Sequence, residues 1–286
     1  MTHSTRAWLQ MHFCVILWGF TAILGKTITL PALPLVWLRM IVVTAALMLF
    51  PGFWRGLSGM PLRLVATYAG IGAVVTAHWV TFYGAIKLAN ASVAATTMAL
   101  TPVFVAFVEP LLIRRRFDVR ELFFGLAVVP GVALVVGGTP AGMRGGIAVG
   151  ILSALFAAIF SVLNKRFIEK GSALTVTGLE MAAGAVCLAF FSPFVMPDRH
   201  DAILLLALAL VCTLVPFALS LVALRHLSAF SSSLAVNMEP VYAIVLAIVL
   251  LGEQRELTTT FYVGVAIIVA VVFGHGRVDR ITYTPS

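Results

Sequence analysis

The chain has 286 residues, of which 61% are apolar and only 10% are charged, and its mean hydropathy is +1.08. Soluble domains average roughly 45–50% apolar and about 25% charged residues, so this composition excludes a water-soluble globule and indicates a protein embedded in a lipid bilayer. The net charge of +8 does not indicate a nucleic-acid partner, because the basic residues are spread over short loops.

Ten apolar segments follow one another along the chain, separated by charged residues, proline or glycine. They cover residues 7–26, 33–50, 64–87, 91–113, 121–138, 145–165, 174–193, 202–224, 229–251 and 258–275. A helix that crosses the bilayer needs about 20 apolar residues, so ten crossings leave no room for a soluble domain. We therefore predict an all-α, polytopic membrane protein with ten transmembrane helices.

The basic residues predict the orientation of these helices. If the N-terminus lies inside, the inner segments hold thirteen of the nineteen Lys and Arg residues and the outer loops hold five, with Arg39 inside a span. Cytoplasmic loops carry the Lys and Arg excess in membrane proteins. We therefore expect both termini in the cytoplasm and the chain in a bacterial-type inner membrane.

The chain also repeats itself after about 138 to 141 residues. In this register the corresponding pairs are Lys26 and Lys165, Arg39 and Glu180, Lys87 and Arg225, Ala91 and Ala229, and Pro102 and Pro240. We predict two five-helix repeats, 1–138 and 139–286. Because five is odd, the second repeat enters the membrane from the opposite side, and inverted repeats place a transporter's binding site near the midplane, between the halves.

Several short motifs recur in a characteristic order. They are Trp18-Gly19, Pro34 to Leu38-Arg39, Tyr83-Gly84-Ala85, Leu100-Thr101-Pro102, Glu239-Pro240-Val241 and Leu251-Gly252-Glu253. Together they resemble the EamA family of the drug/metabolite transporter superfamily. The resemblance implies a ten-helix carrier that exports small metabolites, many of them amino acids. One departure is that Arg114-Arg115-Arg116 stands where the first repeat of that family has Gly-Glu, so an acidic corner is expected only at Glu253.

Glu239 is the leading candidate for substrate binding. It lies near the middle of its span and directly precedes Pro240, whose missing N–H frees the carbonyl of Val236. The alternative is a structural anchor that bonds a neighbouring helix. Pro102 occupies the corresponding place in the first half, so the two prolines predict paired hinges or breaks, with passive kinks as the alternative.

Other candidate site residues are polar or aromatic groups within the spans. His78 could bind a carboxylate or relay a proton, and the alternative is a buried histidine bonded to a backbone carbonyl. We expect Trp18, Tyr83 and Tyr242 to line the passage, unless they are packing residues. Asn237 lies roughly 200° around the helix from Glu239, so both can face one cavity only if Pro240 breaks the helix.

The remaining ionisable groups within or beside the spans are interpreted as structural. A charge at a helix centre costs roughly 2.5–3.5 kcal/mol, so each needs a partner. Arg39 is expected to snorkel or to pair with an acid such as Glu253, and Glu180 lies at the opposite depth. Glu109 could neutralise nearby arginines. Gly146 and Gly150 form a small-residue step that allows close helix approach.

The sequence contains no HExxH, GxSxG, P-loop or CxxC motif. We therefore predict no catalytic residue, metal or cofactor, and an ATP-driven pump is excluded for this chain alone. The prediction is a secondary carrier that exports amino acids or related metabolites by alternating access. Export of nucleosides or cationic drugs, and a non-coupled channel or scaffold, are the alternatives. Proton coupling through a mid-span Glu or His and uncoupled, downhill transport fit the sequence equally.

Overall fold

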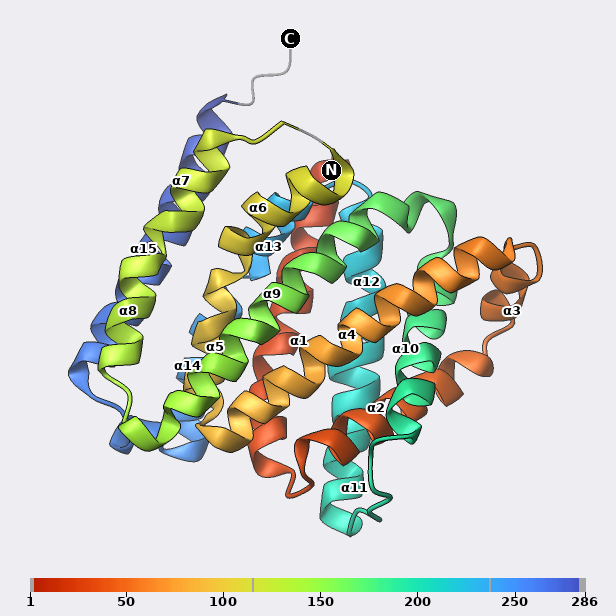
Figure 1. Cartoon of the computed structure of the whole chain (residues 1–286), viewed down its shortest axis with the longest axis horizontal. Coiled ribbons are helices and arrows are strands. Elements are labelled where there is room, and N and C mark those ends of the chain that lie inside the picture. Colours follow the sequence, from red (N-terminus) through yellow and green to blue (C-terminus); the bar gives the residue numbers. More distant parts are fainter. Residues whose placement is uncertain (1–2, 115, 237, 283–286) are drawn as a thin grey trace.

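The computed structural model describes residues 3–114, 116–236 and 238–282, and helices make up all its regular structure in those ranges (Figure 1). The first half contains α1 (His3–Thr27), α2 (Ala32–Met48), α3 (Pro51–Ser58), α4 (Leu62–Leu88), α5 (Ala91–Thr97), η1 (Met98–Leu100), α6 (Thr101–Ile113), α7 (Val119–Ala127) and α8 (Val129–Gly137). The second half contains η2 (Ala141–Met143), α9 (Arg144–Phe167), η3 (Ile168–Lys170), α10 (Ala173–Ala189), α11 (Arg199–Leu206), η4 (Ala207–Leu214), α12 (Val215–Leu224), α13 (Ala229–Val236), α14 (Glu239–Leu246), η5 (Ala247–Leu251), η6 (Glu253–Arg255) and α15 (Thr259–Thr282).

Five of these helical segments are long and apolar enough to cross a membrane, and the pair α2 and α3, bent by 85°, makes a sixth candidate. Four shorter apolar helices cover Gly125–Gly137, Ala173–Ala189, Glu239–Leu251 and Thr259–Val271. Each of the ten predicted segments overlaps one of these ten stretches, which confirms a multipass membrane fold. The exact number of crossings stays a prediction, because the four shorter helices have only 10–17 residues.

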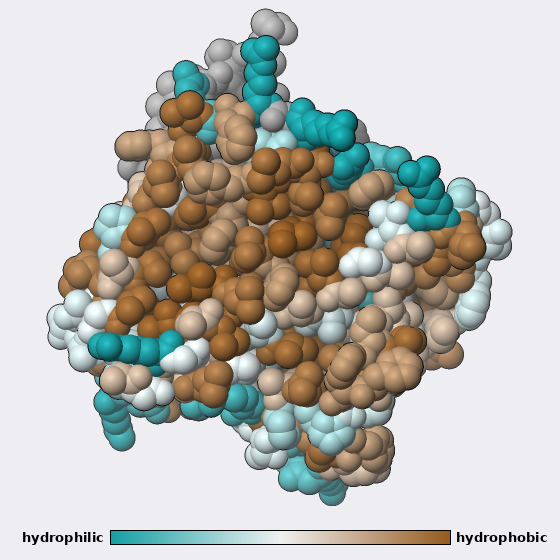
Figure 2. All heavy atoms as spheres, in the orientation of Figure 1, coloured by the Kyte–Doolittle hydropathy of each residue, from teal (hydrophilic) through white to brown (hydrophobic). Residues whose placement is uncertain are grey.

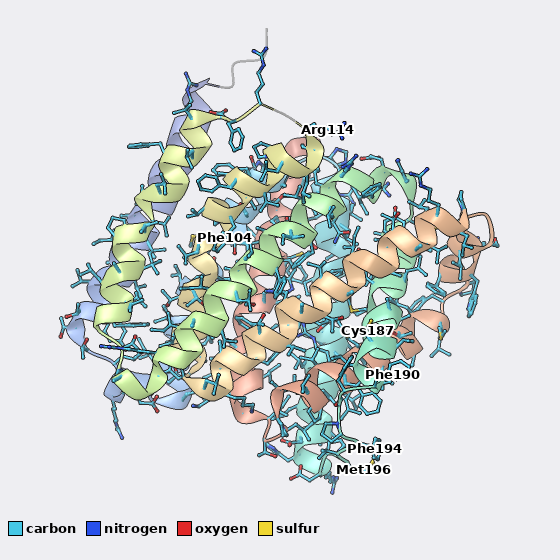
Figure 3. The ribbon with its side chains drawn as sticks, in the orientation of Figure 1. Phe104, Arg114, Cys187, Phe190, Phe194 and Met196 are labelled. Atoms are coloured by element: carbon cyan, nitrogen blue, oxygen red, sulfur yellow. The ribbon has the colours of Figure 1, made fainter. Side chains whose placement is uncertain are left out.

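The surface has the polarity that a bilayer requires. Apolar side chains form a broad belt across the middle of the molecule, and hydrophilic groups gather above and below it (Figure 2). Phe190, Phe194 and Met196 project from the connection between α10 and α11, at the lower edge of this view (Figure 3), and Phe190 is 82% exposed. In water such exposure would be unfavourable, whereas lipid solvates these groups.

Helices that correspond in the predicted repeats make corresponding contacts. α4 of the first half packs on α9 of the second, and correspondingly α12 of the second half packs on α1 of the first. In the same way α10 packs on α4, and η4 packs on α2. Lys87 Nζ donates to the Ile28 carbonyl, and Arg225 Nη2 donates to the Ile168 carbonyl. The first bond joins the end of α4 to the end of α1, and the second joins the end of α12 to the end of α9, which are the corresponding helices of the predicted repeats. The boundary between residues 138 and 139 stays a prediction.

The predicted small-residue step brings α9 close to its neighbours. A Cβ added at Gly146 would lie 2.6 Å from Ala89 Cβ, and one at Gly150 would overlap the Thr97 side chain. Both positions therefore require glycine for the observed approach of α9 to α4 and α5, as expected from the sequence.

The two prolines stand at corresponding places in the helices. α5, the 3₁₀ turn η1 and α6 follow one another as one apolar helical segment, Ala91–Ile113, with Pro102 in the first turn of α6. α13 ends at Val236, and α14 begins at Glu239 with Pro240 in its first turn. Hinges or breaks at the two prolines stay a prediction.

Candidate functional site

A cavity of about 110 Å³ lies in the interior of the helix bundle. Side chains from α1, α2, α4, η1 and α6 of the first half line it, together with side chains from α9, α12, α13 and α14 of the second. A buried water needs roughly 10–15 Å³ of such space, so the cavity has room for several waters or a small organic solute. The cavity therefore lies between the predicted halves, where an inverted repeat is expected to bind its substrate.

Arg39 brings a positive charge to the cavity wall from α2. Its side chain is 2% exposed; Nε donates to Thr213 Oγ1 at 2.6 Å, and Nη1 donates to the Tyr83 hydroxyl at 2.8 Å. The guanidinium carbon lies 3.8 Å from the centroid of the Trp79 ring, which adds a cation–π contact. These contacts hold the guanidinium without a carboxylate, so the charge stays available to a ligand.

The expected pairing of Arg39 with Glu253 is wrong. Glu253 is 1% exposed, and its carboxylate accepts hydrogen bonds from the backbone N–H groups of Ala91 and Ser92 and from the Ser92 hydroxyl, at 3.0, 2.9 and 2.6 Å. It therefore caps the N-terminus of α5, where free N–H groups and the helix dipole favour an anion.

Glu239 brings a carboxyl group to the same cavity from the first turn of α14. Its side chain is 8% exposed, and within the described ranges no hydrogen bond or ion pair engages its carboxylate. The helix N-terminus favours an anion at this place. Glu239 and Arg39 are within electrostatic range of each other, and no bond joins them in the described part of the chain, so the cavity offers a carboxyl group and a guanidinium to one ligand.

His78 lies on α4 with its ring at the cavity. Nδ1 lies 3.0 Å from the Ser153 carbonyl, and the Ser153 hydroxyl lies 2.9 Å from the His78 carbonyl. Nδ1 also lies 2.9 Å from the Ser153 hydroxyl, so the ring is bonded to Ser153 through Nδ1. The predicted bond to a backbone carbonyl is present, whereas a role of His78 in binding a carboxylate or relaying a proton stays a prediction. Ser153 is fully buried, so its hydroxyl holds α9 against α4 and does not face a ligand.

The predicted aromatic residues have different positions. Trp18 and Tyr83 line the cavity, and Phe82 and Phe160 flank His78 there. Placing Tyr242 in the passage was wrong, because it does not line the cavity. The Tyr242 Cβ would lie 2.8 Å from a Cβ added at Gly19, so this residue packs against the backbone of α1. Asn237, also predicted to bind substrate, lies outside the described residues.

Two further acids were expected to be structural. Glu109 is buried beside Pro110 in α6, and its role in neutralising arginines stays a prediction. Glu180 is 0% exposed on α10, where the Asn164 amide lies 3.5 Å from Oε2. Sequence reasoning missed Asn164, although a single amide in an apolar span is a visible signal. It also missed Thr213, whose approach to Arg39 has no local sequence signature.

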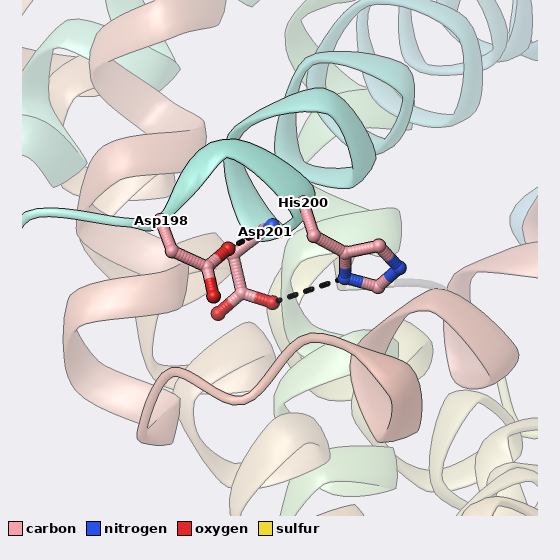
Figure 4. Close-up of side chains that lie close together, drawn as sticks. All are labelled: Asp198, His200 and Asp201. Atoms are coloured by element: carbon pink, nitrogen blue, oxygen red, sulfur yellow. Dashed lines mark hydrogen bonds and ion pairs between the residues drawn. The ribbon is translucent and has the colours of Figure 1, made fainter.

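Asp198, His200 and Asp201 gather at the start of α11 (Figure 4). Asp198 accepts from the Asp201 N–H, and Asp201 accepts from the backbone and hydroxyl of Thr29. These bonds cap α11 and tie it to the connection between α1 and α2, so the cluster has a structural explanation.

Known proteins resemble this chain over nearly its whole length. The sequence profile of the EamA-like transporter family matches residues 6–137 and again 144–274. A Bacillus subtilis (strain 168) protein named "Uncharacterized transporter YxxF" is 26% identical over 272 residues, covering 90% of this chain and 86% of that protein. A solved crystal structure with 20% sequence identity has a TM-score of 0.71 and covers 98% of this chain and 99% of its own, so the two folds are alike.

Proposed function

The chain belongs to the EamA-like transporter family, and from this premise we propose that it exports amino acids or closely related zwitterions through the central cavity by alternating access. The chain lies in a bacterial inner membrane with both termini in the cytoplasm. Tags at the two ends that become accessible to impermeant reagents on opposite faces of the membrane would overturn this orientation.

The observation that carries the proposal is that a guanidinium and a carboxyl group line the same cavity without a bond between them in the described residues. A guanidinium binds a carboxylate through two parallel N–H donors, and Arg39 Nη2 has no bond within the described structure. Glu239 can then accept from the substrate's ammonium group. An amino acid matches both groups, and Trp18 and Phe160 offer apolar surface to its side chain.

The alternative substrates match this cavity less well. A cationic drug would pair with Glu239 but would meet the like charge of Arg39, which has no bonded anion of its own. A neutral nucleoside would leave both charges desolvated without a charged partner, at a cost in free energy. The lining thus favours a molecule that carries both signs.

Alternating access is supported by the position of the cavity between the halves and by the paired prolines. Pro240 lies in the first turn of α14, next to Glu239, and Pro102 lies in the first turn of α6, directly after the 3₁₀ turn η1. Helices that change geometry at such places let one half tilt against the other around a fixed site. The transport cycle is then a rocking of the halves that exposes Arg39 and Glu239 to one side at a time.

Counterflow in proteoliposomes tests the proposal. Purified protein is reconstituted with an excess of unlabelled L-leucine, L-phenylalanine, uridine or ethidium inside, and uptake of the same labelled compound is followed. We expect saturable counterflow of an amino acid, with Glu239→Gln lowering its initial rate about tenfold or more, as for one lost charged contact. Glu256→Gln, at an exposed carboxylate outside the cavity, is the matched control.

Two outcomes would overturn the proposal. Saturable counterflow of uridine or ethidium, with no amino acid carried, would refute the substrate class. Flux that does not saturate and shows no counterflow would indicate a channel. Normal amino-acid transport by Glu239→Gln would remove that carboxylate from the site.

A further inference from the structure

We propose that Glu180 is a proton-binding site that couples transport to the proton gradient. It is distinct from the pair Arg39 and Glu239, and it communicates with the cavity through Asn164. This inference rests on the proposed function for its transport readout, whereas proton binding itself can be measured without any substrate.

The polar atoms around Glu180 are incompletely bonded. Glu180 and Asn164 are 0% and 1% exposed, and their one mutual contact, from Asn164 Nδ2 to Glu180 Oε2, is long at 3.5 Å. Among the residues that the structure describes, Glu180 Oε1, Asn164 Oδ1 and Thr177 Oγ1 find no hydrogen-bond partner. Thr177 precedes Glu180 by three residues and so shares its face of α10. Buried oxygens without partners require an explanation, and a proton on the carboxyl supplies a donor to this group of acceptors.

The neighbouring helices supply no bonded cation that would hold a charged carboxylate. The backbone of α4 touches Glu180 directly, since a Cβ at Gly72 would lie 2.7 Å from Glu180 Cα. Tyr68 of α4 is within electrostatic range, but its hydroxyl donates to the Phe167 carbonyl. Arg225, after α12, donates to the Gly171 carbonyl, and Arg39 of α2 donates to Thr213 and Tyr83. Burying an ionised carboxylate with so few partners costs free energy that protonation removes.

Asn164 connects this site to the cavity. Its side chain lies on the cavity wall and also contacts Glu180, which itself does not line the cavity. Protons can therefore reach Glu180 from the cavity when it opens to either side. The reaction is the dissociation of one carboxylic acid into a carboxylate and a proton, and the proton moves to or from water without another reactant.

Glu180 is better placed for this role than the two groups suggested by the sequence. Glu239 lies on the cavity wall at a helix N-terminus and within electrostatic range of Arg39, so its carboxyl is placed to meet a substrate ammonium group. His78 already uses Nδ1 on the Ser153 carbonyl. In the predicted repeat, Glu180 is also the counterpart of Arg39, so the two halves place a proton acceptor and a fixed cation at corresponding positions.

Two measurements on the full-length protein test the proposal. In the first, the pH-dependent infrared difference spectrum of substrate-free protein is recorded. We expect a protonated-carboxyl band that titrates with pH in the wild type and is missing from Glu180→Gln, while Glu239→Gln retains it. In the second, L-leucine or L-phenylalanine, whichever the wild type carries, is followed with and without a pH gradient. We expect Glu180→Gln to keep counterflow and lose gradient-driven accumulation, and Glu180→Asp to retain some accumulation.

Each contrary outcome is informative. A carboxyl band that does not change with pH, or one that persists in Glu180→Gln, would overturn the site even if no transported substrate is found. Wild-type transport that responds to a sodium gradient and ignores the pH gradient would overturn the assignment of the proton. If Glu180→Gln does not fold, the infrared titration of the wild type and of Glu180→Asp decides the question.

Discussion

Replacing Glu253 with glutamine removes one acceptor from the cap of α5 and keeps the shape of the side chain. The carboxylate now accepts three hydrogen bonds in a site that is 1% exposed. A glutamine has one acceptor oxygen and one NH₂ group. If its oxygen takes the two bonds from Ser92, its NH₂ meets the N–H of Ala91, and this buried donor loses its partner.

The magnitude follows from these contacts. An unsatisfied buried donor costs about 1–3 kcal/mol, and the two remaining bonds lose charge assistance, so we expect the free energy of unfolding to fall by about 2–4 kcal/mol. The assay is titration with a denaturing detergent in mixed micelles, followed by tryptophan fluorescence. Glu256→Gln is the control, because that exposed carboxylate accepts only from Asn90 Nδ2 and surface changes usually stay within about 0.5 kcal/mol. Equal stability of the two variants would refute the capping argument.

Three further predictions concern packing and the cavity. Gly72→Ala should lower the free energy of unfolding by about 1–3 kcal/mol, because its Cβ would overlap α10. At Gly70, on the same helix, an added Cβ would meet no atom within 4 Å, so Gly70→Ala should raise the free energy of unfolding by about 0.5–1 kcal/mol. Equal shifts for the two variants in the same detergent titration would contradict this reasoning. Arg39→Lys should raise the half-saturating concentration for amino-acid counterflow about tenfold. The planar guanidinium donates to Thr213 and Tyr83 and still has Nη2 for a ligand, whereas a lysine ammonium group lacks this geometry. An unchanged half-saturating concentration would show that the guanidinium is not required. His78→Ala should reduce efflux from loaded vesicles without lowering the yield of folded protein, and normal efflux would remove His78 from the site.

The membrane-spanning segments could be predicted because apolar composition reports directly on contact with lipid. The position of Pro102 and Pro240 in the first turn of α6 and of α14 has a similar local cause, since proline lacks the backbone donor that a helix interior needs. In both cases the signal lies within the segment itself.

The partners of Arg39 could not be predicted in this way. Thr213 lies 174 residues further along the chain, and it reaches Arg39 from the π-helical turn η4. Nothing in the local sequence indicates that turn. The prediction for Tyr242 also failed because of long-range packing. An aromatic residue near a mid-span proline suggests a lining residue, but the missing side chain at Gly19 lets α14 pack closely against α1 at Tyr242. Long-range packing decides both cases.

The cap on α5 makes the two ends of the bundle chemically unequal. Along the repeat, Arg114–Arg116 occupy the place that corresponds to Glu253, and a guanidinium has no acceptor to offer the start of α13. Arg114 and Arg116 are exposed. Opening the bundle at the Glu253 end would break the three hydrogen bonds that the buried Glu253 carboxylate accepts. At the other end the exposed side chains of Arg114 and Arg116 form no such cap. For the proposed transport cycle we therefore expect the Glu253 end to open more slowly than the end that carries the arginines.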